Sequence, residues 1–318
     1  MSDLQKPSFD KAKHISQCLE LAILLESSAE KPGNVNRTAA FQNTRYEHFL
    51  ASAVALSSSF ERAAELGHAV AKGKIQASDV GIGRIIKECM INIDAWQHGG
   101  NTLLGTTILL SPLAVAAGMT PIKEDVFAIS ELRKYVKLVV ESTTSEDAVN
   151  VYEAIRAARP GGLGTSSKLD VNDPRSIKMI REENISLYMI FKIAEKYDRI
   201  CSEWVNNYPI TFDFAYPSLV TQLGKRDLGY ATVHTFLSVL AEYPDTLIAR
   251  KTNNEKAESV SRSAKEILES GFETQSSKAR LREFDTELRR SSNLLNPGAT
   301  ADIIAAALAL SLLGGYRP

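Results

Sequence analysis

The octapeptide Glu30-Lys31-Pro32-Gly33-Asn34-Val35-Asn36-Arg37 combines residue types that can bind an anion. Gly33 has no Cβ, so its backbone N–H can come close to a ligand. Lys31 and Arg37 flank this N–H and the Asn34 amide, and together they would form an anion cradle of backbone donors and two charges. The stretch also fits a helix end followed by an exposed turn, because Pro32 cannot lie inside the preceding helix.

A second loop, residues 100–107, reads Gly-Asn-Thr-Leu-Leu-Gly-Thr-Thr and leads into an apolar helix. It is not a P-loop, since Thr106 stands where the lysine belongs and no strand precedes it. Asn101, Thr102 and Gly105 can still bind a phosphate through free N–H groups at the positive end of the helix. The alternative is close helix packing, with Asn101 as the N-cap.

Two more loops have a similar composition. Residues 159–167 contain three glycines, three hydroxyl side chains and one arginine, which is the composition of a phosphate nest without a standard spacing. Residues 296–302 open the last apolar helix, with Asn296 and Gly298 in the turn and Thr300 as a candidate cap. Asp302 falls in the first helical turn, where the helix dipole favours a carboxylate.

Other carboxylates are candidates for proton transfer or metal binding. Asp245 follows a buried helical segment and precedes Thr246 and Arg250. Asp198 and Glu203 lie five residues apart, a spacing that places two side chains poorly on one helix face, so they predict a metal site only weakly. No standard metalloprotease, hydrolase or dinucleotide-binding motif occurs.

These residues must be positioned by helices. Apolar residues recur at helical spacing and strand signals are nearly absent, so we expect an all-α fold. About ten helices would form one bundle-like domain over residues 1–318. The expected helices cover residues 14–28, 46–66, 84–97, 108–117, 125–140, 145–158, 176–208 (one helix or two joined), 222–242, 255–270, 276–291 and 301–313.

The composition limits the classes of function. A net charge of −1 argues against a general nucleic-acid binder. The three cysteines form no paired motif, so a reduced, cytoplasmic setting is expected. The apolar runs at 103–119 and 303–313 are too short or too interrupted to span a membrane, and residues 1–13 do not resemble a signal peptide. The sequence leaves the oligomeric state open, a homodimer being one alternative.

The order of the loops resembles the triphosphoribosyl-dephospho-CoA synthase family over residues 15–313. The matching stretches are Lys31-Pro-Gly-Asn-Val35, Phe49-Leu-Ala-Ser-Ala53, Gly100-Asn-Thr-Leu-Leu-Gly105, Pro244-Asp-Thr246 with Arg250, and Asn296-Pro-Gly298 with Ala301-Asp302. Each stretch is short, but five in the same order are specific. The loops at 31–37, 100–106, 245–250 and 296–302 each lie at a helix end and use glycine or proline, so we expect them to line one cleft.

The resemblance implies an enzyme that joins the ribose of ATP, with its 5′-triphosphate, to the 2′-hydroxyl of 3′-dephospho-CoA while adenine leaves. The product would be a prosthetic-group precursor for citrate or malonate decarboxylating lyase systems. Asp245 would take the proton of the acceptor, with Asp302 as second choice, and Asp198 or Glu203 would hold Mg²⁺. The nucleotide-binding residues would be Lys31, Gly33, Asn34, Arg37, Asn101, Thr102, Gly105, Thr246, Arg250, Asn296 and Gly298.

The sequence also departs from the family. Members usually carry Asp where Asn36 stands and a His-Lys pair where Leu103 and Leu104 stand, and residues 251–254 replace a glycine-rich stretch. The chain thus looks like a divergent branch of archaeal type. The alternatives are a transferase that keeps the donor chemistry but uses a different acceptor, a non-catalytic nucleotide- or CoA-binding protein of the same fold, and a helical scaffold without a ligand.

Overall fold

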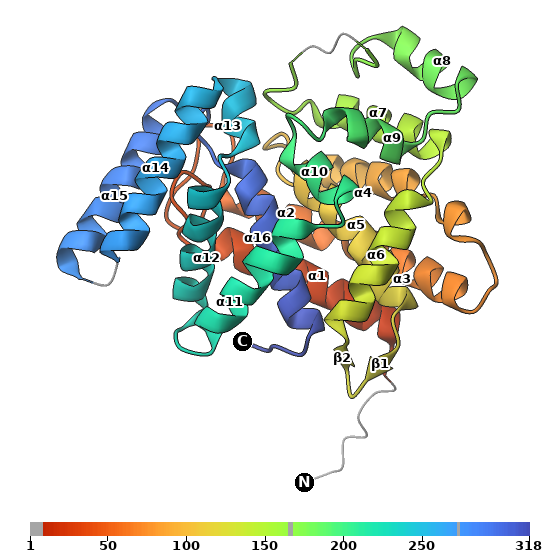
Figure 1. Ribbon diagram of the computed structural model, residues 1–318, viewed down its shortest axis with the longest axis horizontal. Coiled ribbons are helices and arrows are strands. Elements are labelled where there is room, and N and C mark those ends of the chain that lie inside the picture. The colour runs from red at the N-terminus through yellow and green to blue at the C-terminus, as the bar shows by residue number, and fades with distance from the viewer. Residues whose placement is uncertain (1–8, 165–167, 272–273) are drawn as a thin grey trace.

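The computed structural model describes residues 9–164, 168–271 and 274–318, and the regular secondary structure of this part of the chain is almost entirely helical (Figure 1). The helices of the first half are α1 (Lys11–Ser28), α2 (Tyr46–Ala55), α3 (Ser57–Ala71), α4 (Ile82–Trp96), α5 (Leu104–Met119), α6 (Ile129–Glu141), α7 (Ser145–Ala158) and α8 (Pro174–Glu182). Those of the second half are α9 (Leu187–Ala194), α10 (Arg199–Val205), α11 (Tyr216–Leu223), α12 (Leu228–Glu242), α13 (Thr246–Lys251), α14 (Asn254–Ser270), α15 (Gln275–Arg290) and α16 (Gly298–Leu313).

Three small elements complete the fold: a 3-10 turn, η1 (Ala77–Val80), a π-helical turn, η2 (Ile210–Ala215), and one hairpin. Strands β1 (Ile122–Lys123) and β2 (Val126–Phe127) pair antiparallel, with Ile122 opposite Phe127. The predicted all-α class is confirmed. The expectation of one domain over residues 1–318 stays a prediction.

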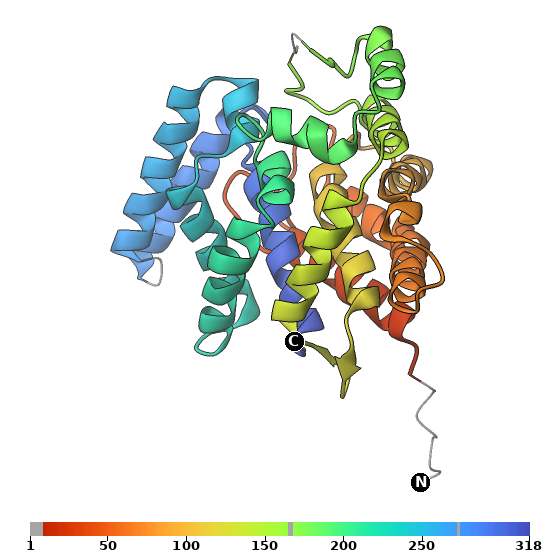
Figure 2. The ribbon, with the colours of Figure 1, turned by 45° about the vertical axis from the view of Figure 1, so that its right-hand side comes forward.

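The last helix is the centre of the core. Helix α16 is apolar on every side, and nearly all of its residues are buried. Figures 1 and 2 show it between α12 and α5, and it also packs along α1. Its many alanines allow these neighbours to approach closely, and α5 is equally enclosed. Because the two enclosed helices begin side by side, the loops that precede them meet.

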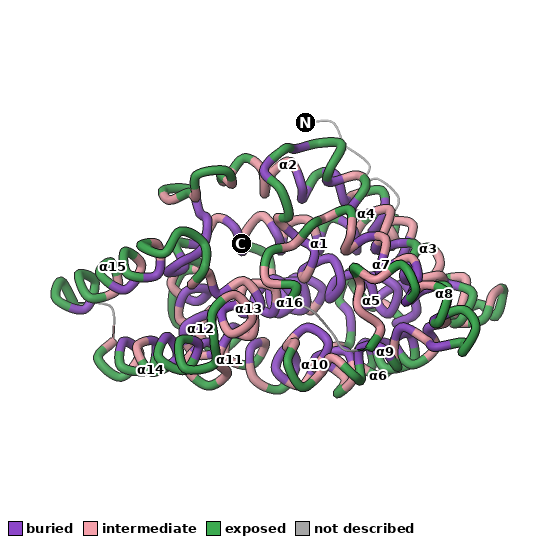
Figure 3. Tube along the Cα trace, turned by 90° about the horizontal axis from the view of Figure 1, so that it is seen from above, coloured by how far each residue is buried: buried purple, intermediate pink, exposed green. Residues whose placement is uncertain are grey.

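The periphery is more polar. Helices α14 and α15 form a hairpin at one side of the molecule, with exposed residues on its outer surface (Figure 3). Only Ser277, Phe284 and Leu288 of α15 are buried. No helix among the described residues is both long and apolar enough to cross a membrane.

The helix count exceeds the ten expected because several predicted helices are broken. The segment expected at 46–66 bends at Leu56, whose N–H donates to the carbonyl of Ala53 at 3.2 Å. The segment 176–208 is three helices, not one or two joined. Asn184 adopts a left-handed φ of 50°, and Ser186 and Asp198 then cap α9 and α10.

Candidate active site

One pocket of about 480 Å³ lies where the four predicted loops meet. Its lining includes Asn34 and Val35, residues 99–106, three residues after position 246, and residues 296–302 in part. The first and last loops are joined directly, because the Asn34 amide donates to Oδ1 of Asn296 at 2.5 Å. The expectation that these loops converge on one cleft is confirmed. The loop at 159–164 and helices α9 and α10 complete the lining.

Helix ends position these segments. Helix α1 ends at Ser28 beside the pocket, whereas α5, α13 and α16 begin there. Leu103 is the N-cap of α5, and Oδ1 of Asn101, two residues earlier, accepts the Leu104 N–H at 3.1 Å. The starts of α5 and α16 carry partial positive charge, which favours anionic ligands and carboxylates nearby.

Asp302 forms part of the pocket floor. It comes from the first turn of α16 and is half-buried. Its Oδ1 accepts the Thr106 hydroxyl at 2.5 Å, and Gly105 leaves room for its second oxygen. Burial raises the pKa of Asp302 to about 8, with a further rise from the charges of Glu26 and Asp245 and a partial opposing effect of the Thr106 hydrogen bond. Asp302 is therefore largely protonated at neutral pH.

Lys31 was expected to be a loop cation that faces an anion, and this expectation is wrong. Its side chain is fully buried and does not line the pocket. Its Nζ lies 2.9 Å from Oε1 of Glu26 and also donates to the backbone carbonyls of Glu26 and Ala29. A buried ammonium group needs such a counter-ion and acceptors, because it has lost its hydration.

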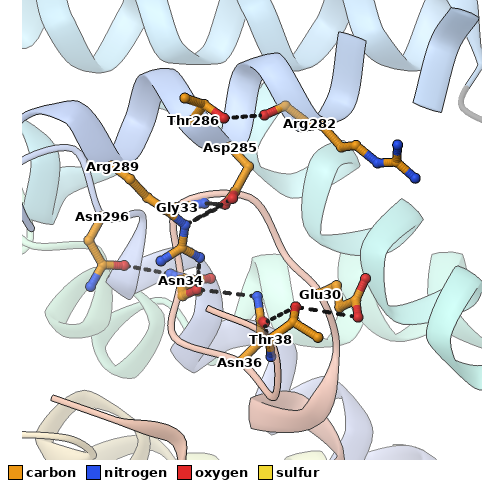
Figure 4. Close-up of polar contacts among 10 residues, drawn as sticks. All are labelled: Glu30, Gly33, Asn34, Asn36, Thr38, Arg282, Asp285, Thr286, Arg289 and Asn296. Atoms are coloured by element: carbon orange, nitrogen blue, oxygen red, sulfur yellow. Dashed lines mark hydrogen bonds and ion pairs between the residues drawn. The ribbon is translucent and has the colours of Figure 1, made fainter. Parts of the chain in front are cut away.

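Gly33 does not offer its N–H to a ligand either. That N–H donates to Oδ1 of Asp285 on α15 at 2.8 Å, and a Cβ at residue 33 would overlap Leu288 (Figure 4). Arg289 pairs with the same Asp285 at 2.9 Å and donates to the carbonyl oxygen of Asn34. The α14–α15 hairpin thus holds the backbone of the loop from outside, while the Asn34 side chain reaches Asn296.

Arg37 is exposed and lines a separate, shallow hollow between this loop, the start of α12, and α15. The anion cradle expected from Lys31, Gly33 and Arg37 is therefore not assembled: one cation is paired internally, the N–H is taken, and the second cation lies elsewhere. Asn36 also faces away from the pocket, because its side chain binds the backbone of Asn34 and of Thr38.

The pocket lining also contains cationic side chains, namely those of Arg159, Lys168, Arg250 and Lys251. Arg250 forms an ion pair with Asp198, and Lys251 donates to the carbonyl oxygen of Asn293 at 2.9 Å. Burial lowers the pKa of both Arg250 and Lys251 from their ordinary values. Residues 165–167, which supply the three hydroxyls of the glycine-rich loop, lie outside the described residues.

Asp245 was expected at the rim of the cleft, but it lies beneath the pocket and is 2% exposed. Its Oδ1 accepts the N–H groups of Leu247 and Ile248, and its Oδ2 accepts the N–H and hydroxyl of Thr300 at 2.7 and 2.8 Å. Burial raises the pKa of Asp245, and these hydrogen bonds oppose the rise. Asp245 caps α13 and ties it to α16, and its proposed catalytic role stays untested.

The two expected metal ligands do not share a site. Asp198 lines the pocket but is paired with Arg250 and caps α10. Glu203 is fully buried and accepts from Ile210 and Thr211 at the start of η2. Burial raises the pKa of Glu203. The part of the chain that is described contains no group of three or more His, Cys, Asp or Glu side chains able to hold a metal.

The remaining residues predicted from the sequence fall into two groups, those that line the pocket and those that do not. Asn101, Thr102, Gly105, Asn296 and Gly298 line the pocket. The Thr102 hydroxyl also contacts that of Ser52 at 2.8 Å. Thr246 is not in the lining, and its hydroxyl accepts the N–H of Arg199 at 3.0 Å.

Sequence reasoning missed Glu26, a carboxylate of the pocket lining. Its position within the apolar stripe of α1, five residues before a lysine, was the available signal. It also missed apolar side chains of the pocket lining, among them Phe41, Phe49, Ile190 and Phe191. Aromatic and apolar lining residues can receive a purine or another flat group.

The chain belongs to the ATP:dephospho-CoA triphosphoribosyl transferase family, whose model matches residues 12–318. It is therefore an enzyme of the transferase class, as the resemblance predicted. A comparison with the curated proteins finds no match. Among solved structures, it is similar to a protein from Archaeoglobus fulgidus to which triphosphoribosyl-dephospho-CoA synthase activity is provisionally assigned, at 24% identity and a TM-score of 0.63. The match covers 86% of this chain and 100% of the other, and it supports the fold alone.

Proposed function

We propose that the enzyme transfers the 5′-triphosphoribosyl group of ATP to the 2′-hydroxyl of 3′-dephospho-CoA, with release of adenine. The observation that carries this proposal is the composition of the pocket lining. It combines cationic side chains (Arg159, Lys168, Arg250 and Lys251) with the carboxyl groups of Glu26 and Asp302 and with several apolar side chains. The volume of about 480 Å³ falls within the range of small-molecule sites, roughly 300–1,000 Å³.

We place the triphosphate at these cationic side chains. Its charges need cations and N–H donors, and Arg159 with the following glycines offers both. The loop at 31–37 then contributes only Asn34 and Val35 to the pocket. Mg²⁺ that accompanies the triphosphate stays a prediction, and no step is assigned to a metal ion.

Asp302 is placed to assist the leaving group. Breaking the bond between C1′ and N9 leaves negative charge on adenine, which a protonated carboxyl can neutralise by donating its proton. A pKa of about 8 keeps that proton available at neutral pH. The proton that the acceptor hydroxyl loses must go to a second group.

A different acceptor is the second candidate. Leu103 and Leu104 line the pocket, where members of the family usually carry a His-Lys pair, so the departure lies within the site. The Asn36 departure lies outside it. A more apolar lining at residues 103 and 104 favours an acceptor with less negative charge at that point.

The test is adenine release from ATP by the purified protein, measured with dephospho-CoA, with CoA and without an acceptor. The proposal expects release with dephospho-CoA and the corresponding mass of the coupled product. Adenine release that needs another acceptor would mean that dephospho-CoA is not the acceptor, whereas ATP would remain the donor. ATP binding without any release would indicate the non-catalytic binding protein instead.

A further inference from the structure

Lys31 and Glu26 form a buried ion pair at the edge of the pocket. The Lys31 side chain is fully buried and the Glu26 side chain is 8% exposed, with 2.9 Å between Nζ and Oε1. Glu26 lines the pocket, whereas Lys31 does not. The cation therefore contacts the carboxylate from the side that faces the protein.

This pairing gives the buried Lys31 its counter-ion. Among the described residues, the other contacts of Lys31 Nζ are to backbone carbonyls, so Glu26 is the group that balances its charge. A buried ammonium group needs such a partner because it has lost its hydration. Glu26 thus pairs with a buried cation and also lines the pocket.

Asp302 has the opposite surroundings. Its hydrogen-bond partner is the neutral Thr106 hydroxyl, and Arg250, the cation that acts on it, is already paired with Asp198. The negative charges of Glu26 and Asp245 favour the protonated form of Asp302. Two carboxyl groups of one pocket therefore differ in protonation, and such a difference assigns acid and base roles.

We propose that Glu26 is the general base of the transfer, with Lys31 as its positioning residue. This inference rests on the proposed function. As the bond from C1′ to N9 breaks, Asp302 gives its proton to adenine. The acceptor hydroxyl oxygen bonds to C1′ and gives its proton to the Glu26 carboxylate. Proton exchange with water then returns Asp302 to its protonated form and Glu26 to its carboxylate form. In the net reaction, the acceptor hydroxyl loses one proton and adenine gains one.

The experiment compares Glu26→Gln with Glu30→Gln as a matched control. Glu30 is an exposed carboxylate in the loop that follows α1, and it does not line the pocket. Loss of a general base should lower kcat by about 100-fold or more. We expect that loss for Glu26→Gln, with the Kd for ATP unchanged within about threefold, and wild-type turnover for Glu30→Gln.

Glu26→Gln leaves Lys31 buried without a counter-ion and can lose stability. The double variant Glu26→Gln with Lys31→Met removes both charges, so we expect it to recover stability but not turnover. If Lys31 acts only through Glu26, Lys31→Met lowers kcat in the wild-type background and has no further effect on kcat in Glu26→Gln.

Two results would overturn the inference while the proposed function stands: a folded Glu26→Gln variant with near-normal kcat, or recovery of turnover in the double variant. A wild-type protein that binds ATP but releases no adenine with any acceptor would remove the proposed function and this inference together.

Discussion

Gly105 and Asp302 are in such close contact that a Cβ at residue 105 would lie 2.0 Å from Oδ2 of Asp302. Gly105→Ala must therefore displace Asp302 or the start of α5. A shift of about 1 Å at a reacting group can lower the rate roughly 100-fold. We expect adenine release to fall by that order while ATP still binds.

The matched control is Gly224→Ala, at the exposed end of α11, where the added Cβ would meet its nearest atoms at an ordinary 3.7 Å. It should retain wild-type turnover. Full activity of Gly105→Ala would mean that the position of Asp302 does not matter for the reaction.

The pH dependence of turnover follows from Asp302. Its pKa of about 8 lies above the ordinary 3.8 because of burial and the nearby Glu26 and Asp245 charges, with Arg250 acting in the opposite direction. The protonated form is the donor, so kcat should hold below pH 8 and fall as pH rises through that value. Asp302→Asn should abolish this decline together with most of the turnover. A kcat that increases above pH 8 would contradict the acid role.

The same pKa affects stability. The folded state retains a proton that the unfolded chain releases above its ordinary pKa of 3.8. The contribution of this proton to the stability of the folded state is complete below pH 3.8 and is lost as the pH rises toward 8. The free energy of unfolding of Asp302→Asn, relative to wild type, should therefore increase between pH 5 and pH 8. Denaturant titrations at the two pH values measure it, and a constant difference would contradict the raised pKa.

Asp245→Asn tests structure against catalysis. An amide cannot accept on both sides as the carboxylate does, so it must lose contacts with either α13 or Thr300. Hydrogen bonds to a charged group contribute about 1.5–3 kcal/mol each, and we expect a loss of that size in the free energy of unfolding. Unchanged stability with a turnover loss of ~100-fold would instead support the catalytic role that the sequence predicted for Asp245.

Arg159→Ala and Arg37→Ala form a matched pair of exposed arginines. Arg159 lines the main pocket, and Arg37 lines the separate hollow behind the loop. Loss of a charge-assisted contact with the triphosphate should weaken ATP binding by about tenfold or more in Arg159→Ala only. Calorimetric titration with ATP measures both. A larger effect in Arg37→Ala would indicate that the phosphates bind at the loop at 31–37, as the sequence predicted.

Lys31→Ala should affect stability more than ATP contacts. Removing one partner of a buried ion pair typically costs roughly 3–5 kcal/mol, because the other charge is left without compensation. Thermal and denaturant unfolding would show the loss directly. A variant of wild-type stability with weakened ATP binding would mean that Lys31 contacts the nucleotide after all.

Residue types and helix periodicity were enough to predict the fold class and the meeting of four loops. Glycine and proline mark helix ends, and ends of enclosed helices such as α5 and α16 must lie together. The spacing of residues along the sequence could not predict which hydrogen-bonding groups remain available to a ligand. The Gly33 N–H is taken by Asp285, 252 positions later, and both oxygens of Asp245 are taken by α13 and Thr300.

The sequence also could not show that the charged side chains of Lys31 and Glu26 are buried. Lys31 in a turn looks like a solvent-facing cation, and only the packing of the helices around it shows that Glu26 is its partner. The breaks between α8, α9 and α10 were readable in principle from Ser186 and Asp198, which are good N-cap residues within an apolar pattern.

The central position of α16 affects how the protein is made. During synthesis, the apolar faces of α1, α5 and α12 stay uncovered until α16 emerges from the ribosome, because α16 follows all of them in the chain. Until residues 298–313 emerge, the nascent chain lacks the central helix of its core and Asp302, so it exposes apolar surface and has an incomplete pocket. Ribosome-bound chains that stop before residue 298 should therefore depend on chaperones, and the ability to bind ATP should appear only once residues 298–313 have emerged.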